Sequence, residues 1–107
     1  APLRVVDPGA AGQAIRPETA ITIGQAMVAA VNAPGAFAAG ARIPGVVVAG
    51  KTGTAEVPSG APHGWFVGFA PADAPVAVVA VVIENTPGGG EDAAPVGAAV
   101  LRAALGR

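Results

Sequence analysis

The chain has 107 residues, which suits one small domain or a piece of a larger one. Apolar residues make up 52% and charged residues only 12%, a balance that excludes charge-rich disorder. The formal net charge is -1 and the six basic residues are scattered, which argues against a nucleic-acid-binding protein. Cysteine is absent and histidine occurs once, so disulfides, thiolate nucleophiles and the usual zinc sites are excluded. We expect neither a metal nor a cofactor.

The first part of the chain predicts one helix between two loops. Residues 1–16 show little pattern and are predicted as a lead-in loop. A helix is predicted over 17–33, because a proline and a glutamate suited to a first turn precede apolar residues at helical spacing. That spacing gives the helix one face for burial. A Pro-Gly pair then ends it, and 33–45 is predicted as a loop with Phe37 as its anchor.

Three strand-like segments follow, over residues 46–57, 64–70 and 76–85. The third is a nearly unbroken run of β-branched residues, the pattern of a strand buried on both faces. Short linkers favour antiparallel pairing. After a glycine triplet that breaks the chain, a second helix is predicted over 91–106, and its apolar stripe needs the sheet as a partner. The predicted fold class is therefore α+β, with three antiparallel strands within 46–85 flanked by an N-terminal and a C-terminal helix.

Residues 45–52 satisfy the phosphate-binding loop pattern G-x-x-x-x-G-K-[ST]. The residues that would wrap a phosphate are Val46, Val47 and Val48, which are β-branched and prefer an extended strand. The motif also requires a helix after Thr52, but the residues there contain two glycines and a proline. A nucleotide-binding function is therefore disfavoured.

Taken as a strand, the same residues give the string K-T-G-T-A-E at 51–56. The K-T-G element occurs in serine acyl-enzymes that act on D-Ala-D-Ala peptides and β-lactams. Here it follows I-P-G at 43–45 and precedes H-G-W-F-V-G-F-A-P at 63–71. With these motifs the chain resembles class B penicillin-binding proteins from about Pro17 to Leu105. The resemblance implies a partial β-lactamase/transpeptidase-like fold.

Four residues of this string are candidates for the site. Lys51 and Thr52 alternate to opposite faces of a strand, so both serve one site only at an open strand edge. Gly53 has no side chain, which lets a substrate backbone approach. The resemblance implies that Lys51 and Thr54 are catalytic, with the Thr54 N–H as a donor to the oxyanion. It also implies that Thr52, Gly53 and Thr54 bind substrate, with the two hydroxyls on its carboxylate.

Other polar and aromatic residues have plainer interpretations. His63 is the only histidine, but a histidine where a loop enters a strand is predicted to be structural. Glu56 and Glu84 stand at strand ends and are predicted to be solvated. The aromatic residues of the second strand are predicted to pack in the core and at its flank: Trp65, Phe66 and Phe69.

Two motifs of the family are missing. Its nucleophile lies in Ser-x-x-Lys, but Lys51 is the only lysine and Val48 stands three residues before it. Its second element is Ser-x-Asn, but Ser59 is the only serine and Ala61 stands two residues on. Covalent catalysis needs an activated nucleophile. We therefore predict that residues 1–107 are the C-terminal part of a transpeptidase domain, inactive without its upstream part.

The resemblance implies that the parent protein is a peptidoglycan D,D-transpeptidase. It would cross-link D-Ala-containing stem peptides through an acyl-serine intermediate and bind β-lactams. It would work on the extracytoplasmic face of the bacterial membrane, held by an N-terminal helix absent here. The family's sheet implies that the strand of Lys51 is an outer edge. It also implies that 76–85 pairs with an upstream strand, or with another copy in isolation.

Two alternatives to this function stay open. One is a piece of a serine β-lactamase or a D,D-carboxypeptidase, in which water replaces the acceptor peptide. The other is a non-catalytic interaction module that retains the fold of the family.

Overall fold

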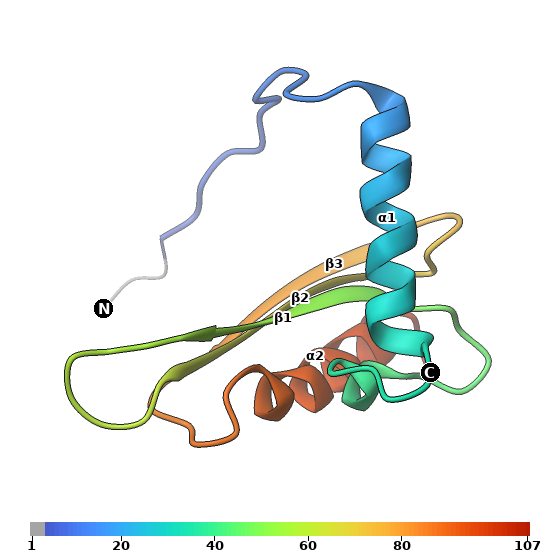
Figure 1. Cartoon of the computed structure of the whole chain (residues 1–107). Helices are drawn as coiled ribbons and strands as arrows, with labels where there is room; N and C mark the ends of the chain where they lie inside the picture. Colours follow the sequence, from blue (N-terminus) through green and yellow to red (C-terminus); the bar gives the residue numbers. More distant parts are fainter. Residues whose placement is uncertain (1–3) are drawn as a thin grey trace.

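The computed structural model describes residues 4–107 (Figure 1). Residues 4–16 form no helix or strand. The elements that follow are α1 (Pro17–Asn32), the short 3₁₀ helix η1 (Ala39–Ala41), β1 (Ala49–Ala55), β2 (His63–Ala70), β3 (Ala77–Ile83) and α2 (Gly90–Ala104). The antiparallel sheet between α1 and α2 confirms the predicted α+β class.

The sheet has the order β1-β2-β3, and both strand pairs are antiparallel. Lys51 pairs with Val67, whereas Thr52 pairs with Phe66. Paired residues share a face and successive residues alternate, so Thr52 and Thr54 lie on the face of Phe66 and Lys51 lies on the other. β1 is an outer strand of this sheet, which agrees with the edge position expected for the strand of Lys51.

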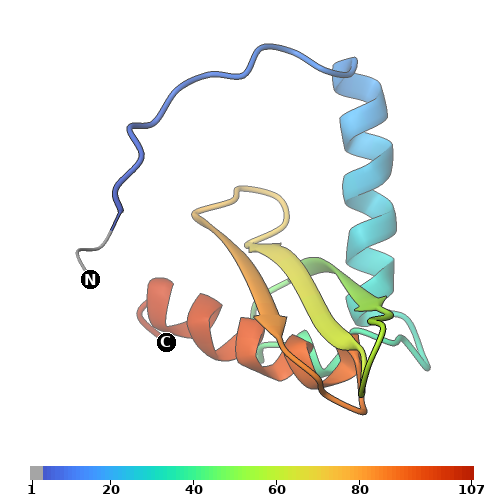
Figure 2. The ribbon, with the colours of Figure 1, turned by 90° about the vertical axis from the view of Figure 1, so that its left-hand side faces the viewer.

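Helix α2 covers one face of the sheet (Figure 2). Phe66 is fully buried and fills the space between this helix and the strands. Three glycines surround its ring. A Cβ on Gly50, Gly68 or Gly97 would lie 2.5, 2.7 or 2.3 Å from a ring atom. The three glycines leave room for the ring of Phe66, which can therefore pack closely against the sheet and α2 without a void.

Within residues 4–107, no helix covers the opposite face of the sheet over β2 and β3. Val78 on this face is 79% exposed, whereas Val79 on the α2 face is buried. The prediction that 76–85 is buried on both faces is therefore wrong for this chain. The reason is that a run of β-branched residues suits either face of a strand, but α2 provides only one covering layer.

The aromatic residues divide between the layers. Phe66 lies in the core as predicted, but Trp65 is 42% exposed on the uncovered face and Phe69 is half-buried there. Phe37, predicted to anchor its loop, is 76% exposed, so that prediction is wrong. Smaller residues hold this loop because η1 packs closely against α2. The buried hydrophobic residues of the loop are Ala38, Ala41 and Ile43.

Helix α1 stands at the β1 side of the sheet, and its N-terminal half extends away from the strands (Figures 1 and 2). Its C-terminal end is fixed by side chains. Asn32 Nδ2 donates to the Val48 carbonyl at 2.9 Å, and Arg42 Nε donates to the Val31 carbonyl at 2.9 Å. On the face predicted for burial, Val31 is buried, whereas Ile23 is 48% exposed. Among residues 4–107, burial of that face is therefore limited to the C-terminal half of α1.

The regular elements also differ from prediction at their ends. β1 begins at Ala49 rather than at residue 46, because a turn precedes it. In that turn Gly45 has φ +77, and the Val46 N–H donates to the Ile43 carbonyl at 3.1 Å. β3 and α2 likewise end before the predicted residues 85 and 106.

Candidate functional site

A polar cavity of about 280 Å³ lies along the edge strand β1. Its walls come from β1, from the loop between α1 and η1, and from the start of α2. The lining residues are Phe37, Lys51, Thr52, Gly53, Thr54, Gly88, Gly90 and Glu91. The four candidate residues of the K-T-G-T string therefore meet at one cavity on a strand edge.

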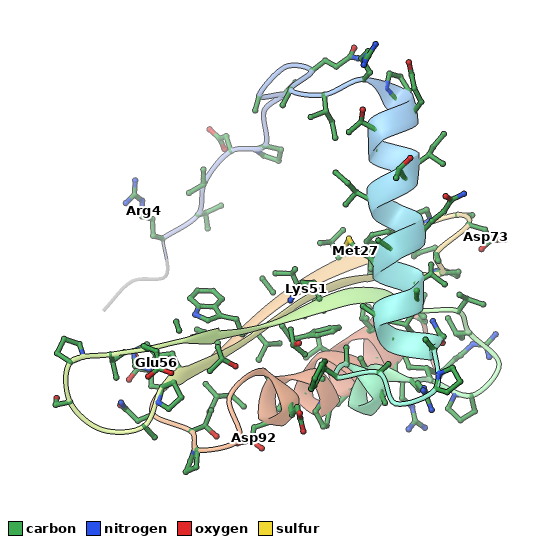
Figure 3. The ribbon with its side chains drawn as sticks, in the orientation of Figure 1. Arg4, Met27, Lys51, Glu56, Asp73 and Asp92 are labelled. Carbon is green, nitrogen blue, oxygen red and sulfur yellow. The ribbon has the colours of Figure 1, made fainter. Side chains whose placement is uncertain are left out.

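Lys51 extends from the face of β1 that points away from α2 (Figure 3). Its side chain is exposed, and its Nζ donates a hydrogen bond to the Thr52 carbonyl oxygen. It also lines a second cavity of about 210 Å³, beside Phe37 and Ala38. Lys51 lies in an extended strand and not in a loop that opens a helix, so the phosphate-binding loop geometry is excluded.

Thr52 and Thr54 lie on the face of β1 that contacts α2. The Thr54 Oγ1 accepts a hydrogen bond from the Gly90 N–H at 3.2 Å. Gly90 is the first residue of α2, so this hydroxyl satisfies one of the free N–H groups at the helix start. A hydroxyl has two acceptor lone pairs and one proton, which leaves the Thr54 proton able to donate into the cavity. Thr54 thus has a structural contact that the sequence did not indicate.

The glycine triplet Gly88–Gly90 brings the start of α2 against β1. Gly89 has φ +60, and a Cβ there would lie 2.5 Å from the Thr54 Oγ1. A Cβ on Gly90 would lie 2.7 Å from the Thr52 Cβ. From the sequence the triplet is only a break between elements. Three consecutive glycines at a predicted helix start nevertheless indicate that the backbone there lies close to another segment of the chain.

Two acidic residues in the first turn of α2 have different surroundings. The Asp92 carboxylate accepts hydrogen bonds from the Thr86 hydroxyl and, at 3.0 Å, from the Gly88 N–H. Thr86 is buried, so this contact fixes the loop that leads into α2. Glu91 instead lines the cavity, and across the described residues 4–107 no side-chain hydrogen bond engages its carboxylate. The sequence indicated only a helix start for both residues.

The other polar residues singled out in the sequence lie outside this cavity. His63 Nδ1 accepts a hydrogen bond from the Asn85 N–H at 3.1 Å, which joins the end of β3 to the start of β2 and supports a structural role. Glu56 and Glu84 are exposed at strand ends, as predicted. Within residues 4–107, no three His, Cys, Asp or Glu side chains are grouped so that they could hold a metal ion. Neither helix in that part of the chain has the length and hydropathy needed to cross a bilayer.

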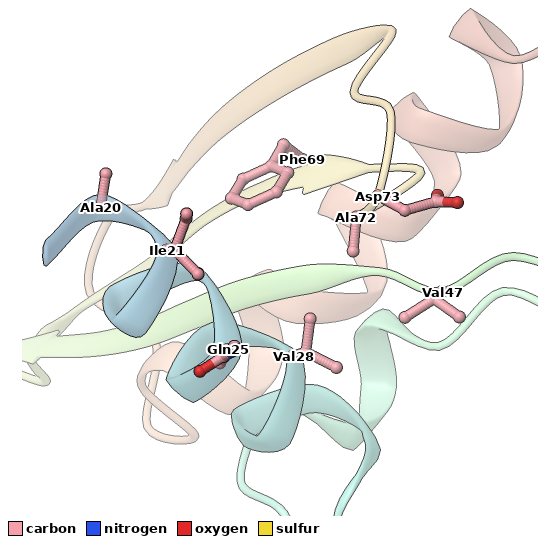
Figure 4. A pocket seen from close by; sticks show the side chains of 9 residues that line it. Ala20, Ile21, Gln25, Val28, Val47, Phe69, Ala72 and Asp73 are labelled. Carbon is pink, nitrogen blue, oxygen red and sulfur yellow. The ribbon is translucent and has the colours of Figure 1, made fainter. Parts of the chain in front are cut away.

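A larger cleft of about 640 Å³ lies between α1 and the sheet (Figure 4). It is lined by Ala20, Ile21, Gly24, Gln25, Val28, Val47, Phe69, Ala72 and Asp73. These side chains are mostly apolar and include no lysine or threonine. We therefore assign the candidate site to the smaller cavity at β1, because that cavity and not the larger cleft is lined by the polar residues of the K-T-G-T string.

The comparisons with known proteins agree on one family. Residues 4–102 match the penicillin binding protein transpeptidase domain. The chain is 44% identical over 102 residues to the peptidoglycan D,D-transpeptidase PbpA of Mycobacterium tuberculosis, which covers 87% of this chain and 20% of that protein.

Solved structures give the same result. The imipenem acyl-enzyme complex of penicillin-binding protein A from M. tuberculosis is similar with a TM-score of 0.72 and 45% identity, over 87% of this chain and 20% of the other. The transpeptidase domain of FtsI4 D,D-transpeptidase from Legionella pneumophila has a TM-score of 0.74 at 33% identity, over 85% of this chain and 37% of the other.

The chain spans about a fifth of the length of PbpA. The matched residues 4–102 nevertheless include the whole cavity at β1 and the glycine triplet at the start of α2. The resemblance drawn from the K-T-G-T-A-E string is confirmed. On the family match and on its similarity to PbpA, this chain belongs to the penicillin-binding protein transpeptidase domain family.

Proposed function

We propose that this chain provides the substrate- and β-lactam-binding part of a peptidoglycan D,D-transpeptidase, which cross-links D-Ala-containing stem peptides through an acyl-serine intermediate. The observation that carries the proposal is that one lysine and two threonines line a single cavity at a strand edge. Such a set suits a carboxylate, because hydrogen bonds to an ionised acceptor are strong. D-Ala-D-Ala peptides and penicillins both carry a carboxylate. Membership of the family supports the same function.

We assign Lys51 and Thr54 to catalysis, and Thr52, Gly53 and Thr54 to substrate binding. Lys51 supplies positive charge beside the carboxylate and to the proton transfers of acylation. The two hydroxyls donate to the carboxylate, and the Thr54 N–H donates to the oxyanion that develops. β1 is an outer strand, and a Cβ on Gly53 would meet only the Trp65 Cβ, at 3.4 Å, so the face of β1 is uncrowded there. A substrate backbone can therefore lie along β1 as an added strand.

In this proposal the nucleophile comes from outside the 107 residues. The only serine, Ser59, is not followed by a lysine three residues on. We propose that the chain is the C-terminal part of a transpeptidase domain, whose upstream part covers the face around Val78 and the apolar cleft beside α1. Uncovered apolar surface of this extent favours such a contact. The 107-residue chain alone is then inactive.

The free edge of β3 belongs to the same proposal. Val78 and Val82 on this outer strand are exposed, and an exposed apolar edge is a template for further strand pairing. We propose that β3 pairs with a strand of the upstream part, or with a second copy when the chain is isolated. The parent protein would work at the extracytoplasmic face of the bacterial membrane, held by an N-terminal helix outside this chain.

Covalent labelling with a fluorescent penicillin tests the main proposal. The parent protein, in which this chain follows its upstream part, should be labelled, and the 107-residue chain alone should not. Lys51→Ala in the parent should slow acylation by about 10²-fold or more, the size of effect that follows loss of one group stabilising developing charge. Glu84→Gln removes a charge outside the cavity and should be labelled like the wild type. Labelling of the isolated chain, or a wild-type rate for Lys51→Ala, would contradict the proposal.

Product analysis separates the transpeptidase from its alternatives. With a stem peptide as donor and a second peptide as acceptor, the parent should form the cross-linked product. Release of the shortened donor alone would identify a D,D-carboxypeptidase, and rapid hydrolysis of the penicillin acyl group would identify a β-lactamase. A folded parent that is never acylated would identify a non-catalytic module.

A further inference from the structure

The cavity at β1 carries a negative charge and an exposed aromatic ring in addition to the Lys51 and threonine groups. Glu91 enters it from the first turn of α2, and Phe37 enters it from the loop between α1 and η1. Phe37 is 76% exposed, although a phenylalanine gains most from burial. Its position on the cavity wall, and not in the core, calls for an explanation other than packing.

The neighbouring residue Asp92 is an acidic residue of the same turn with a purely structural role. Its carboxylate accepts from the Thr86 hydroxyl and from the Gly88 N–H, and it is thereby committed to the loop before α2. Any acid in this turn gains from the positive end of the helix dipole. That gain explains a carboxylate at position 91 but does not explain why Glu91 shares a cavity with Phe37 and Lys51.

A carboxylate and an aromatic face on one cavity are the pair of groups that attract a cationic amine. The amine gains Coulomb attraction from the carboxylate and cation–π attraction from the ring. Lys51 also lines this cavity, and its ammonium attracts an anion. The lining is therefore bipolar, with groups for a carboxylate on β1 and groups for an amine on α2 and on the loop of Phe37.

We propose that this site prefers ligands that carry a cationic amine as well as a carboxylate. The carboxylate lies at Lys51 and the threonine hydroxyls, and the amine lies between Phe37 and Glu91. Glu91 is then a specificity-determining residue. This inference rests on the proposed function, because the carboxylate end of the ligand is the one assigned there.

Three penicillins with the same phenylacetyl side chain provide the test: benzylpenicillin, its α-amino derivative and its α-carboxy derivative. Second-order acylation rates are measured on the parent protein at about pH 6, where the α-amine of the ligand is protonated. The wild type should prefer the α-amino compound over the α-carboxy compound. Glu91→Gln should lower the acylation rate of the α-amino compound, relative to that of benzylpenicillin, by about three- to fivefold. It should raise the rate of the α-carboxy compound, relative to that of benzylpenicillin, to a similar extent.

Matched variants separate recognition from structure. Glu84→Gln removes the same charge outside the cavity and should leave all three ratios unchanged. Phe37→Leu keeps an apolar wall but removes the π face, and should lower the α-amino ratio by about two- to fivefold. It provides an independent readout if Glu91→Gln fails to fold. Glu91→Asp keeps the charge and should keep the order of the three rates.

The outcomes distinguish this inference from the function on which it rests. If all three penicillins acylate the protein and substitution of Glu91 or Phe37 leaves the ratios of their rates unchanged, the inference is overturned. The transpeptidase proposal is unaffected by that result. If Glu91→Gln lowers all three acylation rates equally, Glu91 only stabilises the start of α2. That result would also overturn the inference. Absence of acylation by any penicillin in the folded wild-type parent would overturn both.

Discussion

Gly97→Ala tests whether the packing of α2 on Phe66 holds the site together. Gly97 lies within α2, and a Cβ there would stand 2.3 Å from the Phe66 Cδ1. The ring has no free direction in which to retreat, because Gly50 and Gly68 approach it closely from the sheet. Phe66 is also fully buried, so the clash must be relieved by moving α2 away from the strands.

Two effects of opposite sign determine how much Gly97→Ala changes the free energy of unfolding. An extra methyl group in a well-packed core costs about 1–3 kcal/mol, and a ring enclosed on several sides puts Gly97→Ala near the upper end. Alanine in a helix interior is about 1 kcal/mol better than glycine, which offsets part of this cost. We therefore expect a net loss of about 2 kcal/mol in the free energy of unfolding.

Urea unfolding of the 107-residue chain, followed by the fluorescence of its single tryptophan, measures this loss. A loss of about 2 kcal/mol lowers the urea midpoint by about 1–2 M. Gly24→Ala is the matched control, because Gly24 is also helical but nothing lies within 4 Å of a Cβ there. That variant should gain about 0.5–1 kcal/mol from helix propensity alone. A Gly97→Ala chain as stable as the wild type would refute the packing argument.

Substitutions at three further positions probe the contacts at the start of α2 and at the free edge. Thr54→Val removes the hydroxyl that accepts from the Gly90 N–H and should cost about 1 kcal/mol of stability in urea unfolding, whereas Thr54→Ser should keep most of it. Asp92→Asn weakens two hydrogen bonds to a carboxylate and should cost about 1–3 kcal/mol by the same assay, a result that an unchanged midpoint would contradict. Val78→Lys adds a charge on the exposed outer strand and should reduce self-association of the isolated chain in light scattering. Equal particle size for Val78→Lys and the wild type would argue against pairing through β3.

The sequence predicted those features of the fold that depend on neighbouring residues. The order helix, three strands, helix follows from local periodicity and from short linkers, and it is confirmed. The K-T-G-T string was correctly predicted to lie on a strand, because the β-branched residues before it and the glycines and proline after Thr52 disfavour a phosphate-binding loop. Its position at an edge was implied by the family resemblance and not by this local pattern. Local patterns were sufficient for these conclusions because each involves residues close together in the chain.

Features that depend on distant segments could not be predicted. Burial of the outward face of β3 requires a second layer over the sheet, and an apolar run carries no information about whether that layer is present. The exposure of Phe37 depends on how closely η1 approaches α2, where only small side chains fit. Glu91 looks like any acid in a first helical turn, and only the position of α2 relative to β1 brings it onto the cavity.

The position of α2 therefore links the core to the site. Gly97 lets the middle of the helix approach Phe66, and Gly88–Gly90 let its first turn approach β1. Both contacts are made by backbone without a side chain, so they set how closely α2 approaches β1. Glu91 is attached to one of these elements and Lys51 to the other. The distance between the backbone positions that carry these two side chains is consequently set by the same packing that stabilises the fold. A change that loosens the contacts of Phe66 should therefore also alter how the cavity presents the two charges to a ligand.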